Sequence, residues 1–170
     1  MREVEDFSQS EFDEIYNGLK CCAIKEANAV DFPKAIILGG QPGAGKSSLI
    51  TQLCVRQNKN VVVISGDDFR KEHPRFDQLY AQYGDDYVAY TQKFSSQVTE
   101  RLIDELSREK YNLIIEGTLR TSAVPIRTAE LLKSRGYHVE LAVMAVPPIL
   151  SYVGTIERYE SCLLYTSDAA

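Results

Sequence analysis

The chain has 170 residues, 44% of them hydrophobic and 25% charged, with a formal net charge of −5. It is long enough for one globular domain with a sizeable core, and its mildly acidic balance disfavours a nucleic-acid surface. The longest apolar run, Leu141 to Leu150, contains two prolines and is too short to span a bilayer, and no apolar signal core follows the acidic N-terminus. We therefore expect a cytoplasmic protein that binds neither nucleic acid nor membrane.

Helix and strand patterns alternate along the chain. Ser8 to Glu11 resembles a capping box, which predicts a helix running to about Ala27. Short apolar runs rich in branched residues predict buried strands at residues 35–38, 61–64, 111–115 and 138–146. Helical spacing of apolar residues predicts helices after residue 47, at 87–110, at 126–134 and from about 149. This alternation predicts an α/β fold of three layers, with a mostly parallel central sheet flanked by helices.

A group of four tyrosines, Tyr80, Tyr83, Tyr87 and Tyr90, precedes the long predicted helix. Their spacings of three and four residues predict one helical face, although Gly84 interrupts the pattern. We interpret this face as a packing surface rather than a site of chemistry.

The strongest chemical signal is the stretch from Gly40 to Ser47, which fits G-x-x-x-x-G-K-[ST], the phosphate-binding P-loop. A predicted strand precedes it and a predicted helix follows, which is the context that this motif requires. Backbone N–H groups of the loop would surround phosphate oxygens, Lys46 would reach the β- and γ-phosphates, and Ser47 would bind Mg²⁺. We therefore expect ATP and Mg²⁺ as cofactors. The predicted nucleotide contacts are Gly40, Gln41, Pro42, Gly43, Ala44, Gly45, Lys46, Ser47 and Ser48.

Polar residues also follow two other predicted strands. Asp67 comes directly after the second strand, and Glu116 and Arg120 follow the third. Ligands of open α/β sheets bind beyond the carboxyl ends of the strands, so Asp67 could meet a substrate hydroxyl beside the γ-phosphate. It could equally cap the next short helix, and its position alone does not decide between these roles. Glu100, which lies off the apolar stripe of its helix, would by itself be interpreted as a solvated charge.

The chain resembles the zeta toxin kinases, the toxin half of bacterial epsilon–zeta-type toxin–antitoxin systems. The resemblance extends from about residue 5 to about residue 161, and its segments occur in the order of the family. The matching segments are residues 38–46, 66–70 with His73 and Pro74, 115–120, 128–133 and 158–160. The P-loop alone is unspecific, whereas the second and third segments are much more particular.

The resemblance implies ATP-dependent phosphorylation of UDP-N-acetylglucosamine at the 3′-hydroxyl of the sugar, which blocks cell-wall synthesis. It also implies a cognate antitoxin as a partner. Asp67 matches the catalytic base of the family, and Arg158 matches an arginine that closes over the transferring phosphoryl group beside Lys46. The implied substrate contacts are Asp67, Glu100, Glu116, Thr118, Arg120 and Thr128.

The family pattern ends near the end of this sequence. Family members continue for several more helices and carry a second lid arginine, whereas no Arg or Lys follows Arg158 here. We expect residues 1–161 to form an incomplete kinase domain and residues 162–170 to be a non-native or unstructured tail. Two alternatives stay open: a P-loop kinase for another small molecule, and an inactive fragment that binds nucleotide.

Overall fold

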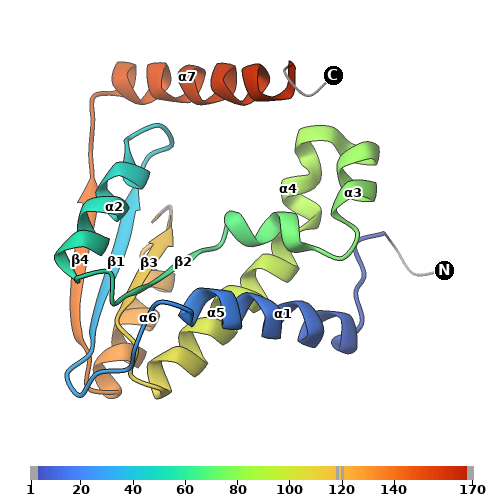
Figure 1. The fold of residues 1–170 in the computed structure, drawn as a ribbon. Helices are drawn as coiled ribbons and strands as arrows, with labels where there is room; N and C mark the ends of the chain where they lie inside the picture. The colour runs from blue at the N-terminus through green and yellow to red at the C-terminus, as the bar shows by residue number, and fades with distance from the viewer. Residues whose placement is uncertain (1–3, 118, 120, 168–170) are drawn as a thin grey trace.

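The computed structural model describes residues 4–117, 119 and 121–167, and it describes the side chains as far as residue 157. In this part of the chain one sheet contains β1 (Lys34–Gly40), β2 (Val62–Ser65), β3 (Leu113–Gly117) and β4 (His138–Met144). The strand order is β2-β3-β1-β4, and every neighbouring pair is parallel. The helices are α1 (Gln9–Ile24), α2 (Lys46–Arg56), α3 (Phe76–Tyr83), α4 (Tyr87–Tyr90), α5 (Gln92–Arg108), α6 (Ala123–Ser134) and α7 (Pro148–Ser167), with the short 3-10 helices η1 (Asp68–Glu72) and η2 (Gly84–Asp86) (Figure 1).

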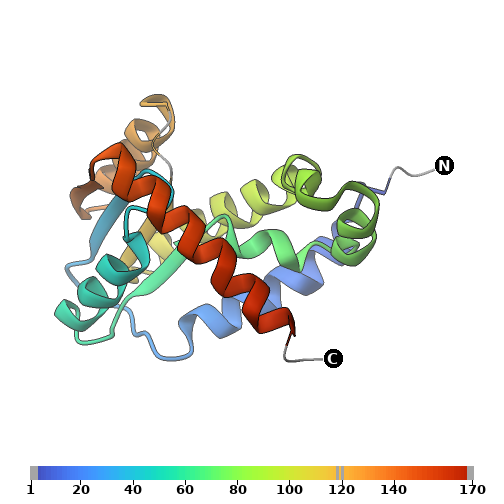
Figure 2. The ribbon, with the colours of Figure 1, turned by 90° about the horizontal axis from the view of Figure 1, so that it is seen from above.

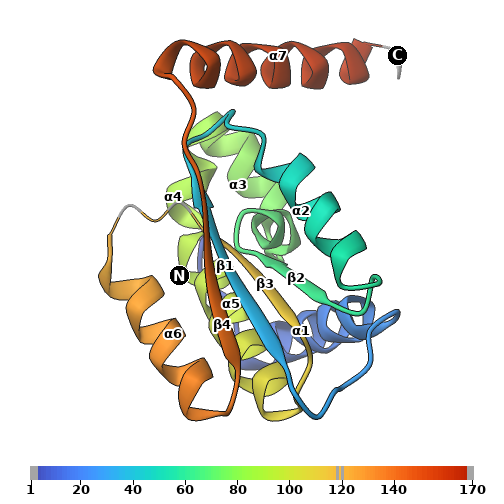
Figure 3. The ribbon, with the colours of Figure 1, turned by 90° about the vertical axis from the view of Figure 1, so that its left-hand side faces the viewer.

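The sheet lies between two helical layers, because successive side chains of a strand point to opposite faces. Ile36 and Leu38 of β1 pack with Leu53 of α2 on one face. Ala35 of β1 belongs to the larger cluster on the other face, which α1, α5 and α6 cover. Figure 3 shows α2 and α6 on opposite sides of the sheet. The predicted three-layer α/β fold with a parallel sheet is confirmed.

Helix α1 begins where the sequence predicts. The Ser8 hydroxyl accepts a hydrogen bond from the Glu11 N–H at 3.3 Å, and the Glu11 carboxylate accepts one from the Ser8 N–H at 2.7 Å. This reciprocal pair is the capping box, which satisfies two N–H groups that the helix leaves unpaired. The helix ends at Ile24, three residues before the predicted end near Ala27.

The predicted single helix at 87–110 is wrong, because α4 and α5 are separate helices on either side of Thr91. The buried Arg70 guanidinium donates to the Val88 carbonyl oxygen at 2.8 Å. In an unbroken helix that carbonyl would accept from the N–H of Gln92. An arginine 18 residues earlier in the chain therefore binds a backbone carbonyl at the break. The local spacing of apolar residues could not predict this break.

The four tyrosines also do not share one helix. Gly84, at φ +55°, separates α3 from α4 in a conformation that favours glycine. Tyr83 stacks on Tyr90 with ring centroids 3.8 Å apart, and Tyr80 meets Tyr87 edge to face at 5.8 Å. The predicted packing role is confirmed, but the pairs join two helices.

Helix α7 crosses above the carboxyl ends of the strands (Figure 2). It runs to Ser167, so residues 162–167 are helical rather than unstructured, and the alternative that the tail is non-native stays a prediction. Within the described ranges, no helix is both long enough and apolar enough to cross a membrane.

Candidate functional site

The loop from β1 to α2 turns through two glycines with positive φ. Gly43 has φ +70° and Gly45 has φ +87°, a region where any other residue is strained. Gly45 is the N-cap of α2, and Lys46 is the first residue of that helix. The first N–H groups of a helix have no partner within it, and the helix dipole is positive there. The loop thus directs a positively polarised helix end toward the carboxyl edge of the sheet.

Lys46 joins this loop to the neighbouring strand. Its ammonium donates to the carbonyl oxygens of Gly40 and Gln41, each at 3.1 Å. The same Nζ lies 3.9 Å from a carboxylate oxygen of Glu116 on β3. Only 15% of the Lys46 side chain is exposed. The lysine is therefore held at the loop, between backbone carbonyls and one acid.

A cavity of about 220 Å³ opens at this point. Its described lining residues are Gly43, Ala44, Gly45, Lys46, Ser47, Glu116, Gly154 and Glu157. A helix N-terminus with an ammonium beside it fits a phosphate group. The volume of the cavity suits the phosphate end of a nucleotide better than a whole nucleotide. The Ser47 hydroxyl and the Glu116 carboxylate offer the oxygen ligands that Mg²⁺ prefers. Among the described residues, no group of three or more His, Cys, Asp or Glu side chains could hold a metal ion.

Asp67 lies at the same edge of the sheet but not in this cavity. Ser65 of β2 pairs with Glu116 of β3. Asp67 therefore lies two residues past the position on β2 that is level with Glu116. Its carboxylate accepts a hydrogen bond from Nε of Arg70 at 3.0 Å, and its side chain is 81% exposed. Asp67 occupies the N-cap position of η1, yet its side chain makes no capping hydrogen bond. Of the two roles left open by the sequence, capping therefore has no support in the geometry.

Other contacts fix the backbone before Asp67. The Ser95 hydroxyl of α5 donates to the Gly66 carbonyl oxygen at 2.7 Å. Arg70 is 9% exposed and also donates to the Gln92 side chain at 2.7 Å. An exposed carboxylate is thus anchored through a buried guanidinium, whose fork of donors holds a fixed geometry. This arrangement limits the positions that the carboxylate can reach.

The predicted substrate contacts are spread over several elements. Glu100 is exposed on α5, and the Thr128 hydroxyl on α6 donates to the Val124 carbonyl oxygen at 3.0 Å. In the described part of the chain, neither residue lines the cavity. Thr118 and Arg120 lie outside the described residues, as does the side chain of Arg158. The substrate roles of these residues stay predictions.

The sequence singled out only Arg158 of α7, and the residues of this helix that the structure places at the P-loop were missed. Gly154 and Glu157 line the cavity, and the Ser151 hydroxyl donates to the Pro42 carbonyl oxygen at 2.6 Å. The prolines after β4 predict a helix at this end of the sheet, but no local pattern shows which of its residues face the P-loop. Spacing of three residues between Ser151, Gly154 and Glu157 places them on one helical face, which is the signal that was available.

Comparisons with known proteins identify the family. Residues 22–165 match the family model described as zeta toxin. The chain belongs to the zeta toxin family. Toxin zeta of Streptococcus pyogenes is 44% identical over 168 residues, which cover 99% of this chain and 58% of the relative. Toxin PezT of Streptococcus pneumoniae is 41% identical over the same share of this chain and 66% of its own length.

Solved structures agree with that assignment. A structure of the PezAT chromosomal toxin–antitoxin system of Streptococcus pneumoniae matches this zeta toxin chain with a TM-score of 0.95 and 41% identity, covering 98% of this chain and 69% of that one. The AvrRxo1-ORF1:-ORF2 complex matches with a TM-score of 0.63 at 17% identity, covering 89% of this chain and 51% of that one, and supports the fold alone. The chain spans 58% of the length of the Streptococcus pyogenes relative.

Proposed function

We propose that this chain carries the catalytic part of a toxin kinase, which transfers the γ-phosphoryl group of ATP to the 3′-hydroxyl of UDP-N-acetylglucosamine. One observation carries the nucleotide half of this proposal. Lys46 stands at the positive end of α2, inside a cavity that also presents Ser47 and Glu116. Membership of the zeta toxin family supports the kinase class, and the resemblance of individual segments supports the acceptor.

Phosphoryl transfer needs positioning and neutralisation of charge more than covalent chemistry from the protein. The P-loop amides and the Lys46 ammonium would bind the phosphate oxygens, and Mg²⁺ bound near Ser47 and Glu116 would supply further positive charge. Asp67 would orient the acceptor hydroxyl and accept its proton. Arg70 would act indirectly, because it fixes the Asp67 carboxylate at 3.0 Å. Arg158 would close over the transferring group from α7.

The acceptor would be bound by residues beyond the P-loop. We assign Glu100, Thr118, Arg120 and Thr128 to the sugar nucleotide, because they match the family segments that carry these contacts. A cognate antitoxin is proposed as the partner, since the PezAT structure is that of a toxin–antitoxin system. Toxicity would follow from loss of a cell-wall precursor.

The direct test is incubation of the protein with Mg²⁺, ATP and UDP-N-acetylglucosamine, followed by mass measurement of the sugar nucleotide. We expect a gain of one phosphoryl group. Asp67→Asn should lower turnover at least about a hundredfold while ATP binding persists, because it removes a proton acceptor and leaves the loop intact. Near-normal turnover in this variant would remove Asp67 from the mechanism. Transfer to a different acceptor in a panel of sugars, nucleosides and antibiotics would identify another kind of P-loop kinase.

A second candidate function is nucleotide binding without transfer. It is favoured by the position of Asp67, which pairs with Arg70 and is absent from the described lining of the phosphate cavity. Tight ATP binding with no phosphorylated product from any acceptor would support this candidate and reject the kinase.

A further inference from the structure

At Gly154 no side chain separates helix α7 from the backbone of the P-loop. A Cβ atom added at Gly154 would lie 2.5 Å from the Gly43 carbonyl oxygen and 3.3 Å from the Gly43 Cα. Cβ atoms in proteins do not approach other heavy atoms to within 3.0 Å, so any other residue here would force α7 and the loop apart. One turn earlier, the Ser151 hydroxyl donates to the Pro42 carbonyl oxygen at 2.6 Å. Two successive turns of α7 therefore contact adjacent residues of the loop.

Gly154 has no role within its own helix that requires glycine. It is the seventh residue of α7, away from both ends, and its φ does not lie in the positive region that favours glycine. Glycine at such a position is about 1 kcal/mol less favourable than alanine. Gly18 of α1 is also inside a helix, but a Cβ atom added there would meet no atom within 4 Å. Of these two helical glycines, only Gly154 lies against another segment, and this contact is the role that the geometry gives it.

The same contact fixes one face of α7 at the phosphate cavity. Gly154 lines this cavity together with Lys46 and Ser47. Arg158 follows four residues after Gly154 in α7, and positions four apart share one face of a helix. The arginine expected to close over the transferring phosphoryl group therefore belongs to the face that the glycine holds against the loop. Its position matters, because a misplacement of about 1 Å can cost about a hundredfold in rate.

We propose that Gly154 is a positioning residue for phosphoryl transfer, which holds α7 against the P-loop and so sets the distance between Arg158 and the bound phosphates. The inference rests on the proposed function and extends it to a residue with no functional group of its own. Gly154 acts through the close approach of two backbones. A side chain at this position would move α7 and its arginine away, while the loop amides and Lys46 would still bind ATP.

The test compares Gly154→Ala with Gly18→Ala, the same substitution in α1, where the added methyl group has free space. The two quantities are kcat for phosphorylation of UDP-N-acetylglucosamine and the Kd of ATP, measured by calorimetry with MgCl₂. Gly154→Ala should lower kcat about tenfold to a hundredfold, because the arginine is misplaced. It should change the Kd of ATP by less than about threefold, because the helix end and Lys46 remain. Gly18→Ala should change neither quantity, and a loss of ATP affinity in Gly154→Ala as large as its loss of kcat would overturn the inference.

A double variant tests whether Arg158 is the group that Gly154 positions. Arg158→Ala alone should lower kcat. Adding Gly154→Ala to it should lower kcat by less than about threefold more, because the group to be positioned is already absent. If the two losses multiplied instead, Gly154 would not act through Arg158 and the inference would be wrong.

Hydrogen exchange tests the position of α7 without any activity. The amides of residues 151–157 should exchange faster in Gly154→Ala than in the unmodified chain, although alanine favours a helix, because α7 loses its contact with the loop. Equal exchange and equal kcat in the two proteins would overturn the inference and leave the proposed function in place. Absence of product from the unmodified chain would reject the proposed function and the role of Gly154 in transfer, whereas faster exchange in the variant would still support the contact of α7 with the loop.

Discussion

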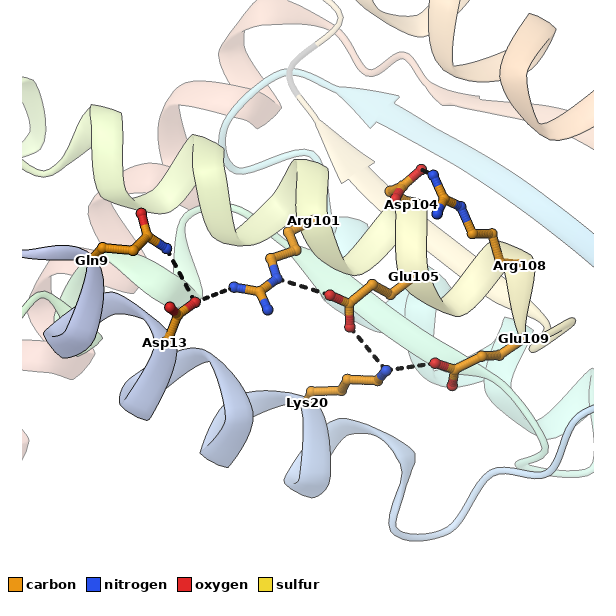
Figure 4. Close-up of polar contacts among 8 residues, drawn as sticks. All are labelled: Gln9, Asp13, Lys20, Arg101, Asp104, Glu105, Arg108 and Glu109. Atoms are coloured by element: carbon orange, nitrogen blue, oxygen red, sulfur yellow. Dashed lines mark hydrogen bonds and ion pairs between the residues drawn. The ribbon is translucent and has the colours of Figure 1, made fainter.

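On the side of the sheet where α1 meets α5, ion pairs of 2.5–2.9 Å join the two helices, whereas in the phosphate cavity the Lys46 ammonium lies 3.9 Å from the Glu116 carboxylate. Lys20 of α1 contacts Glu105 at 2.9 Å and Glu109 at 2.6 Å, both on α5. Arg101 bridges the same pair of helices through Glu105 and Asp13 (Figure 4). The charges of the first region are joined in close ion pairs, while in the second Lys46 is held mainly by loop carbonyls beside the N-terminus of α2. This difference separates a contact that stabilises the fold from a site arranged for a ligand.

The two regions also differ in how they bury apolar surface. Below the α1–α5 contact, Phe12, Tyr16 and Phe94 are at most 4% exposed. By contrast, Leu141 of edge strand β4 and Ile149 of α7 are each 66% exposed. Stability should therefore depend on the first region and function on the second, and each of the following variants should affect one region without the other.

The largest effect is expected from Phe94→Ala. Phe94 is fully buried, and its ring meets those of Phe7, Phe12 and His73 with centroids 5.3–5.6 Å apart. Removing a buried aromatic ring costs about 3–5 kcal/mol, since apolar contacts are lost and a cavity remains. Urea unfolding should show this loss. Val88→Ala, at an exposed site of α4, should change stability by less than about 0.5 kcal/mol.

Lys46→Ala, in contrast to Phe94→Ala, should lower activity and leave stability nearly unchanged. Loss of the ammonium should lower turnover at least about a hundredfold, because it stabilises charge on the transferring phosphoryl group. The unfolding midpoint should change little, since the side chain bonds only to loop carbonyls and lies near Glu116. Lys133→Ala, which removes an exposed lysine from α6, should alter neither quantity. A Lys46 variant that unfolds more easily and turns over normally would reverse the assignment of the two regions.

Much of this arrangement could be predicted from local sequence. Apolar runs give the four strands, and a glycine loop between strand and helix gives the phosphate site, because both depend on neighbouring residues. The break before α5 was not predictable, since it involves Arg70, 18 residues before the carbonyl that it binds. The face of α7 was missed for the same reason: Gly154 meets Gly43 only after the sheet has formed. A periodic spacing can group residues on one helical face, but it does not say which distant segment that face contacts.

Acid should weaken the α1–α5 contact. Burial alone would raise the pKa of the Glu105 carboxyl, but hydrogen bonds from Arg101 and Lys20 outweigh it and lower the pKa from 4.5 to about 2. Because the folded pKa lies below the unfolded one, the stabilisation is complete above pH 4.5 and is lost as the pH falls toward 2. Solvent screening limits the loss to about 1 kcal/mol.

This pH dependence can be assigned with two variants. Glu105→Gln should flatten the fall in unfolding free energy between pH 5 and pH 2, measured by urea titration at each pH. Glu14→Gln, at an exposed position of α1, should leave the slope as it is. An unchanged slope in Glu105→Gln would mean that other carboxyl groups cause the acid sensitivity.

The smallest effect is expected from Leu141→Thr on β4. The leucine is 66% exposed at the edge of the sheet, and threonine has the β-branched shape that strands favour. Unfolding free energy should therefore change by less than about 0.5 kcal/mol. Leu113→Thr on β3 provides the contrast, because Leu113 is 1% exposed and the same substitution there buries a hydroxyl in the core. If Leu141→Thr destabilised the chain as much as Leu113→Thr, the β4 side would contribute to stability as the α1–α5 side does, and the proposed separation of the two regions would be wrong.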